Sequence, residues 1–133
     1  MSSESHLKFE IVNQVAVITF DNPKTRNAFS ISVREALADA VNEIESNSSI
    51  RAVILTGANE TFCSGGDLRN IASAELDQVG WELRMKSIHP WLIQLLNLKK
   101  PIISAVDGAA AGAGFSLALA GDFILASDRA KFC

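Results

Sequence analysis

The spacing of apolar and polar residues along the chain changes several times, and each change predicts a different element. Two β-branched runs, LKFEIV and VAVITF, are separated by Asn13 and Gln14 and predict a β-hairpin. Three further apolar runs have strand length: RAVILTG, PIISAV and DFILAS. Apolar residues recur at helical spacing from Val33 to Ile44, between the hairpin and RAVILTG. They do so again from Leu76 to Leu98, between RAVILTG and PIISAV. The chain therefore predicts strands that alternate with helices.

The boundaries of these elements come from single residues. Ser32 followed by Glu35 has the spacing of a capping box and predicts the start of the first helix. Pro90 interrupts the second helical region and predicts a kink or two helices. DNPKTRNAFS and ANETFCSGGDLRN are expected to be loops, the second opening a helix near Asp67. A glycine- and alanine-rich segment after PIISAV is expected to lead into a last helix. The order ββ-α-β-α-β-α-β predicts an α/β fold with mostly parallel strand pairing.

Composition narrows the class of protein. With 133 residues, 48% of them apolar and 20% charged, the chain is expected to form one domain with a packed core. The net charge of −3 argues against nucleic acid or an anionic membrane as the main partner. No apolar run reaches membrane-spanning length, and MSSESHLKFE lacks the features of a secretory signal. Cys63 and Cys133 suggest no disulfide framework, so the expected location is the reducing cytoplasm.

Two segments with small side chains carry the candidate chemistry: TFCSGGDL and DGAAAGAGFSLA. Each follows a strand and leads toward a helix, where the first backbone N–H groups have no intrahelical partner. Two such ends that converge can donate to one oxygen and form an oxyanion hole from backbone alone. The small residues would let a ligand carbonyl approach the main chain. Close packing of a helix on a sheet is the alternative explanation for them.

Two other functions are disfavoured by the same segments. GAAAGAGFSL lacks the third glycine of a dinucleotide-binding fingerprint, and no acidic residue ends a suitable next strand. GFSLA is similar to a nucleophile elbow whose last glycine is replaced. However, His6 and His89 both precede Ser116, so the chain order of an α/β-hydrolase triad cannot occur within these residues.

Four ordered segments together resemble the enoyl-CoA hydratase/isomerase (crotonase) family. They are VAVITFDNPKTRNAFS, RAVILTGANETFCSGGDL, KKPIISAVDGAAAGAGFSLALAGDFILAS and the closing AKF. The resemblance covers nearly the whole chain and implies a crotonase-like spiral of ββα units. Because family members are commonly longer, residues 1–133 are expected to be the N-terminal part of a single core domain, truncated before the C-terminal helices. Those helices imply a homotrimer or a dimer of trimers for a full-length form.

The resemblance implies an enzyme that acts on acyl-CoA thioesters, in which the N–H groups of Gly66 and Ala113 stabilise a thioester enolate. Family members often have glycine at the position of Ala113; alanine keeps the N–H and adds a methyl group. Lys24 and Arg26 lie where the family contacts coenzyme A, although both could equally be solvated charges. Ala28 is expected to offer its backbone to the adenine.

The remaining expected substrate contacts are Ser116 in the second segment and Ser64, Asp67 and Leu68, which flank Gly66. Capping a helix is nevertheless the expected role of Asp67. Cys63 has no paired histidine and is not expected to be a nucleophile. No metal is expected, and no cofactor apart from the coenzyme A of the substrate.

One residue departs from the pattern of the family's hydratases. Ser116 stands where they carry one of two carboxylates, and the other lies beyond the AKF segment, so residues 1–133 alone lack a catalytic carboxylate. A serine hydroxyl does not replace a carboxylate near neutral pH. The resemblance therefore favours isomerase-like chemistry or an atypical hydratase. The alternatives are a non-catalytic acyl-CoA-binding or assembly module and a fragment without a stable fold.

Overall fold

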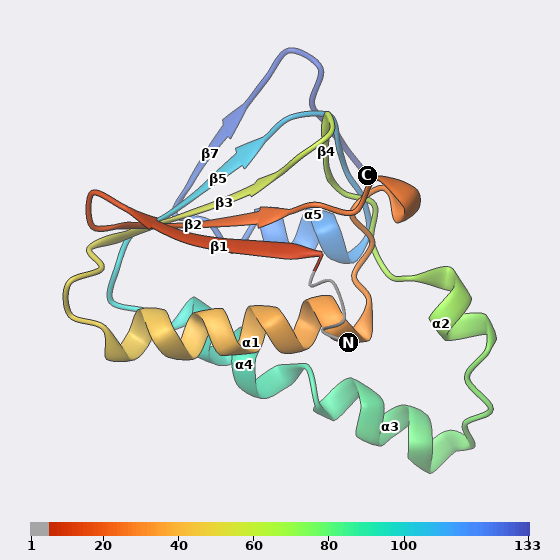
Figure 1. Cartoon of the computed structure of the whole chain (residues 1–133). Coiled ribbons are helices and arrows are strands. Elements are labelled where there is room, and N and C mark those ends of the chain that lie inside the picture. Colours follow the sequence, from red (N-terminus) through yellow and green to blue (C-terminus); the bar gives the residue numbers. More distant parts are fainter. Residues whose placement is uncertain (1–5) are drawn as a thin grey trace.

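The computed structural model describes residues 6–133 (Figure 1). The expectation of no secretory signal concerns in part residues 1–5, which lie outside this range. The elements in chain order are β1 (Leu7–Val12), β2 (Val15–Phe20), the 3-10 helix η1 (Pro23–Thr25), α1 (Ile31–Ser46), β3 (Ala52–Gly57), β4 (Thr61–Cys63), α2 (Leu68–Ala72), α3 (Gln78–Lys86), α4 (His89–Leu96), β5 (Ile102–Val106), β6 (Ala109–Ala110), α5 (Ala113–Ala118), β7 (Phe123–Ala126) and β8 (Lys131–Phe132). Among the described residues, no helix is long and apolar enough to span a bilayer.

The larger sheet contains every strand that the apolar runs predict. Its order is β1-β2-β3-β5-β7; β1 and β2 form the antiparallel hairpin, and the other pairs are parallel. In Figure 1, α1 and α4 lie along one face of this sheet, while α2 and α3 project to one side. Ala16, Ile18 and Phe20 alternate on the buried face of β2 and join a core that includes Leu37 and Leu55. The predicted α/β class with parallel pairing is confirmed.

A second, smaller sheet of three parallel strands was not predicted. It consists of β4, β6 and β8, and the expectation that Thr61–Cys63 belongs to a loop is wrong. All three residues of β4 are buried, and Phe62 packs edge-on against Phe20 of the larger sheet. A strand of three residues is too short to show a period in sequence. Its place is fixed by pairing with β6, which follows far along the chain.

The first helix begins earlier than the capping box predicts. The N-cap is Ser30, whose Oγ accepts a hydrogen bond from the N–H of Val33 at 3.3 Å. Ser32 lies inside the first turn, so the predicted start at Ser32 is wrong. The reason is tertiary: the N–H of Phe29 donates to the carbonyl of Gly65 at 2.7 Å. That bond holds Phe29 in extended backbone and leaves the next residue as the helix cap.

The region around Pro90 forms two helices, as its position predicts. α3 ends at Lys86 and α4 begins at His89, with Pro90 in the first turn, where a missing N–H costs no hydrogen bond. The two helices differ in burial, because α4 buries Trp91 and Leu95 against the core, whereas α3 buries none of its residues. α3 therefore contributes mainly to surfaces and cavities rather than to the core.

Lys100, which precedes β5, caps the C-terminus of a different helix from the one expected. Lys99 and Lys100 suit the C-terminus of the helix that precedes them in sequence. In the structure, Nζ of Lys100 donates to the carbonyl oxygens of Ile44 and Asn47, the latter at 2.7 Å. These carbonyls lie at the C-terminal end of α1. Lys100 therefore ties α1 to the connection between α4 and β5.

Candidate functional site

The two segments with small side chains meet where the smaller sheet ends. The N–H of Ala111 donates to the carbonyl of Cys63 at 3.0 Å, which brings the exit of β6 beside the exit of β4. A methyl group placed on Gly65 would lie 3.8 Å from the nitrogen of Ala113 and 2.9 Å from the carbonyl oxygen of Ala111. Gly65 also has a φ of +102°, a conformation that favours glycine. The turn before Gly66 therefore packs directly on the start of α5.

Most backbone amides around this junction already have acceptors. The donors and their carbonyl acceptors are Ser64 to Arg26 at 3.1 Å, Gly112 to Cys133 at 2.8 Å, and Gly114 to Ala111 at 2.8 Å. Within residues 6–133, the backbone hydrogen bonds of the two segments use neither the N–H of Gly66 nor that of Ala113 as a donor. Ala113 is the first residue of α5, whose amide has no intrahelical acceptor. Both amides thus remain available for an oxygen outside the backbone.

The glycines of the second segment divide between packing and open space. A methyl group on Gly114 would lie 2.3 Å from the carbonyl oxygen of Cys63, so this glycine lets α5 pack closely on β4. A methyl group on Gly112 would meet nothing within 4 Å. Gly112 also has a φ of +53°, which a residue with a side chain rarely adopts. The packing explanation therefore holds for Gly114, while Gly112 keeps the surface beside Ala113 open.

A cavity of about 380 Å³ opens over the first segment. Six of the predicted site residues line it, together with Gly112: Lys24, Ala28, Ser64, Gly66, Asp67 and Leu68. Arg26 instead lines a separate hollow of about 330 Å³ beside Asn59 and Glu60. The structure therefore brings Lys24 to the candidate site, whereas Arg26 lines the separate hollow and touches the site through its carbonyl, which accepts from the N–H of Ser64.

A second cavity, of about 460 Å³, lies on the other side of the α5 N-terminus. Ala113 and Ser116 line it, and its remaining wall is largely apolar. This wall includes Phe29, Met85 of α3, Ile88 at the N-cap of α4, and Trp91, Leu92 and Leu96 of α4. Sequence reasoning missed this wall, because helical spacing of apolar residues does not distinguish a core face from a cavity face. Gly112 lines the first cavity and Ala113 the second, so the start of α5 separates the two.

Three polar side chains near the junction are occupied or buried. Asp67 caps α2, accepting from the N–H of Arg69 at 3.1 Å, as expected from its position before a helix. Cys63 is completely buried, and burial raises the pKa of its thiol, which opposes a nucleophilic role. Oγ of Ser116 donates to the carbonyl of Gly112 at 3.4 Å within α5. The junction therefore offers backbone donors rather than a side-chain acid or base.

Residues 10–133 match the model of the enoyl-CoA hydratase/isomerase family. The chain belongs to this family. Among curated relatives, it is 37% identical to a 1,2-epoxyphenylacetyl-CoA isomerase of Escherichia coli over 89% of this chain and 46% of the relative. It is 38% identical to a probable enoyl-CoA hydratase of Rhodobacter capsulatus over 95% of this chain and 48% of the relative. The enoyl-CoA hydratase/isomerase chain described here thus spans about half the length of these relatives.

The solved structures agree with this assignment. The crystal structure of an enoyl-CoA hydratase from Polaromonas sp. JS666 superposes with a TM-score of 0.86 at 38% sequence identity. The superposition covers 95% of this chain and 49% of that structure. The predicted crotonase-like arrangement is confirmed, and the two sheets described above correspond to part of the fold of an enoyl-CoA hydratase/isomerase.

Proposed function

We propose that the chain binds an acyl-CoA thioester and stabilises its enolate between the N–H groups of Gly66 and Ala113. The observation that carries this proposal is the junction of the two segments, where, among the described residues, both amides lack a backbone acceptor and Gly65, next to Gly66, packs on the start of α5. Negative charge develops on a thioester oxygen as the α-proton leaves, and donors that are already oriented favour this state. One such donor contributes about 3 kcal/mol to other enzymes.

The two cavities support an extended thioester that crosses the start of α5. The cavity with Lys24 and Ala28 is the proposed place for coenzyme A, since a cation there attracts its phosphates. The apolar cavity beside Ala113 is the proposed place for the acyl chain. The thioester carbonyl would then lie between Gly66 and Ala113, where the two cavities adjoin.

Ser116 decides which reaction is proposed. It lines the acyl cavity with a hydroxyl, which does not replace a carboxylate as an acid or base near neutral pH. The rate factor of about 10²–10⁴ that a well-positioned proton-transfer group provides must then come from another residue. We therefore favour isomerase-like chemistry or an atypical hydratase, with the acid or base supplied from outside residues 1–133. The same observation favours a second candidate, a non-catalytic acyl-CoA-binding module. A cytoplasmic homotrimer or dimer of trimers is proposed for the assembled enzyme from the family alone.

The proposed donor pair is testable because Ala113 is the first residue of α5, a position that accepts proline. Ala113→Pro removes one N–H, while Ala113→Gly keeps it and serves as the matched control. The probe is acetoacetyl-CoA, whose enolate absorbs in the ultraviolet. The chain should raise the enolate fraction, the glycine variant should preserve this effect, and the proline variant should lose about a hundredfold in enolate affinity.

Circular dichroism spectra of the variants establish that they fold. A folded proline variant that enolises acetoacetyl-CoA as well as the original chain would refute the role of Ala113. Binding without any enolate signal in the original chain would favour the non-catalytic module. Product analysis with an enoyl-CoA substrate then separates hydration from double-bond migration.

A further inference from the structure

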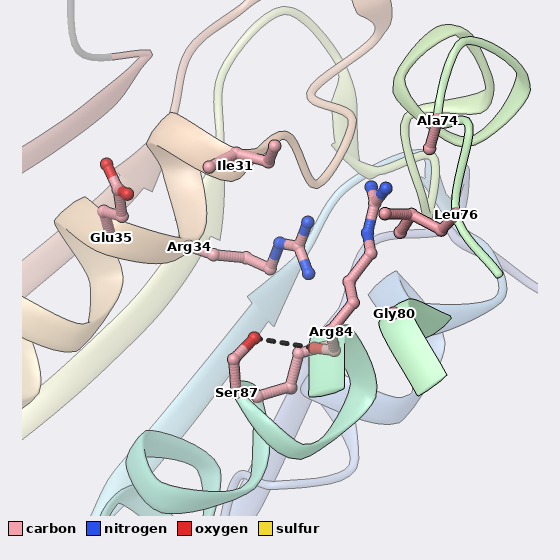
Figure 2. A pocket seen from close by; sticks show the side chains of 9 residues that line it. Ile31, Arg34, Glu35, Ala74, Leu76, Gly80, Arg84 and Ser87 are labelled. Carbon is pink, nitrogen blue, oxygen red and sulfur yellow. Dashed lines mark hydrogen bonds between the residues drawn. The ribbon is translucent and has the colours of Figure 1, made fainter. Parts of the chain in front are cut away.

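A third cavity, of about 500 Å³, lies between α1, α3 and the connection between α2 and α3 (Figure 2). Its walls are partly apolar and include Ile31, Leu76 and Ile88. Arg34 enters it from α1 and Arg84 from α3, and Figure 2 shows both guanidinium groups in the same space, that of Arg84 beside Leu76. Two cations thus share one cavity, whose lining also includes the polar side chains of Glu35 and Ser87.

No carboxylate of the described residues lies within ion-pair distance of either guanidinium. Neither guanidinium takes part in an ion pair within residues 6–133, and Figure 2 shows the carboxylate of Glu35 turned away from both. Nε of Arg34 is buried without any hydrogen-bond partner. Burial and the nearby charge of Arg84 lower the pKa of the Arg34 guanidinium more than the charge of Glu35 raises it. A buried donor without a partner costs about 1–3 kcal/mol, and more when it is charged, so the cavity favours an anion.

Contacts with neighbouring residues hold Arg84 in an orientation that suits anion binding. Its guanidinium lies 5.3 Å from the ring centroid of Trp81, and its Nη1 donates to the carbonyl of Asn70 at 3.4 Å. These contacts orient the group, and within residues 6–133 its other N–H donors have no hydrogen-bond partner. A guanidinium presents two parallel donors that match the two oxygens of a carboxylate. The arrangement therefore suits a carboxylate held between Arg34 and Arg84.

We propose that Arg34 and Arg84 bind the distal carboxylate of the acyl chain, so that the substrate is the coenzyme A monothioester of a dicarboxylic acid. Ile88 lines both this cavity and the apolar cavity that contains Ala113 and Ser116. An acyl chain that begins at Ala113 and fills the apolar cavity can pass Ile88 and end between the two arginines. This assignment rests on the proposed function, because it needs the thioester at Ala113.

The test compares acyl groups that differ only in the distal carboxylate. Isothermal titration calorimetry measures binding of adipyl-, suberyl- and sebacyl-CoA beside hexanoyl-, octanoyl- and decanoyl-CoA. At the chain length that spans the two cavities, the dicarboxylic thioester should bind about tenfold or more tightly than its neutral counterpart. Arg34→Gln and Arg84→Gln should each remove this preference and leave the neutral thioester unaffected. Arg51→Gln, at an exposed arginine before β3, is the matched control and should change neither affinity.

Each failure has a distinct pattern. If neutral thioesters bind and no dicarboxylic thioester is preferred, the carboxylate site is refuted while the proposed function stands. If no thioester binds at all, both fail. Equal binding of free suberate and suberyl-CoA would refute the acyl chain as the source of the carboxylate. If the arginine variants bind a dicarboxylic thioester and its neutral counterpart with equally reduced affinity, the arginines only support the fold.

Discussion

The close contact between α5 and β4 makes Gly114→Ala a sharp test of how the site is positioned. The new methyl group would lie 2.3 Å from the carbonyl oxygen of Cys63 and 2.8 Å from its Cβ. The first distance is about 1 Å shorter than ordinary van der Waals contact. The atoms it meets belong to β4, whose last residue, Cys63, pairs with Ala110 of β6 and cannot swing aside. The helix must therefore move, and Ala113 moves with it.

The expected loss combines two opposing terms. Alanine gains about 1 kcal/mol over glycine from helix propensity. Overpacking against a rigid neighbour costs about 1–3 kcal/mol, and the upper end applies because the contacts include backbone. The net expectation is a free energy of unfolding lower by about 2 kcal/mol, which corresponds to a Tm lower by roughly 8 °C for a chain of this size. The displaced amide of Ala113 should also weaken enolisation of acetoacetyl-CoA.

Gly80→Ala supplies the matched control, because it makes the same change within α3. The added methyl would meet Cδ2 and Cβ of Leu76 at 3.1 and 3.2 Å and Oδ1 of Asp77 at 3.2 Å, contacts that are longer than the 2.3 Å at Gly114. Oδ1 of Asp77 also caps α3 by accepting from the N–H of Gly80 at 2.8 Å, so it should stay in place while the methyl is accommodated by small shifts. The gain of about 1 kcal/mol in helix propensity should offset these milder contacts, so the free energy of unfolding of this variant should stay within about 1 kcal/mol of the original chain. Urea denaturation followed by circular dichroism measures both. Equal stability of the Gly114 and Gly80 variants, with unchanged enolisation, would contradict the packing described for α5.

Three further outcomes follow from the structure. Lys24→Ala should weaken binding of a coenzyme A thioester, more at low salt than at high salt, whereas Arg26→Ala, in its separate hollow, should have little effect; equal losses would contradict this placement. Cys133 should react with a thiol reagent in the native state and Cys63 only after unfolding. Because burial raises the pKa of Cys63, its contribution to stability should be complete below about pH 8.5 and fall as the pH rises further; rapid native modification of both thiols would disprove its burial. Asn27→Ala should lower the free energy of unfolding by about 3 kcal/mol, since its buried amide links η1 to the β3–β4 turn; a Tm within a degree or two of the original would refute that role.

The larger sheet could be predicted because each of its strands leaves a run of apolar residues in the sequence. Strands of two residues such as Ala109–Ala110 leave no such signal, since they have neither period nor composition of their own. They exist because neighbouring segments supply their partners. The predicted start of α1 was wrong for a related reason. The spacing of Ser32 and Glu35 is a local pattern, whereas the hydrogen bond from Phe29 to Gly65 that fixes the start joins distant residues.

The residues of the candidate site likewise divide into those that the sequence could predict and those that it could not. Gly66 and Ala113 could be proposed from sequence, because each follows a strand within a segment of small residues and the family resemblance assigns it a role. Lys24 and Arg26 are two positions apart, and no local pattern separates the one that faces the cavity from the one that does not. Arg34 and Arg84 lie on different helices and meet only through packing, so no motif could have paired them.

Both sheets order their strands as the chain does, β1-β2-β3-β5-β7 and β4-β6-β8. During synthesis from the N-terminus, each strand that emerges finds the edge of its partner already in place. No strand must insert between two that have paired, so the sheets can lengthen by addition at one side while the ribosome is still translating. The same order leaves the newest strand unpaired along its outer edge at every stage. A translational pause after β3 or β5 would hold such an edge open to pairing with other nascent chains.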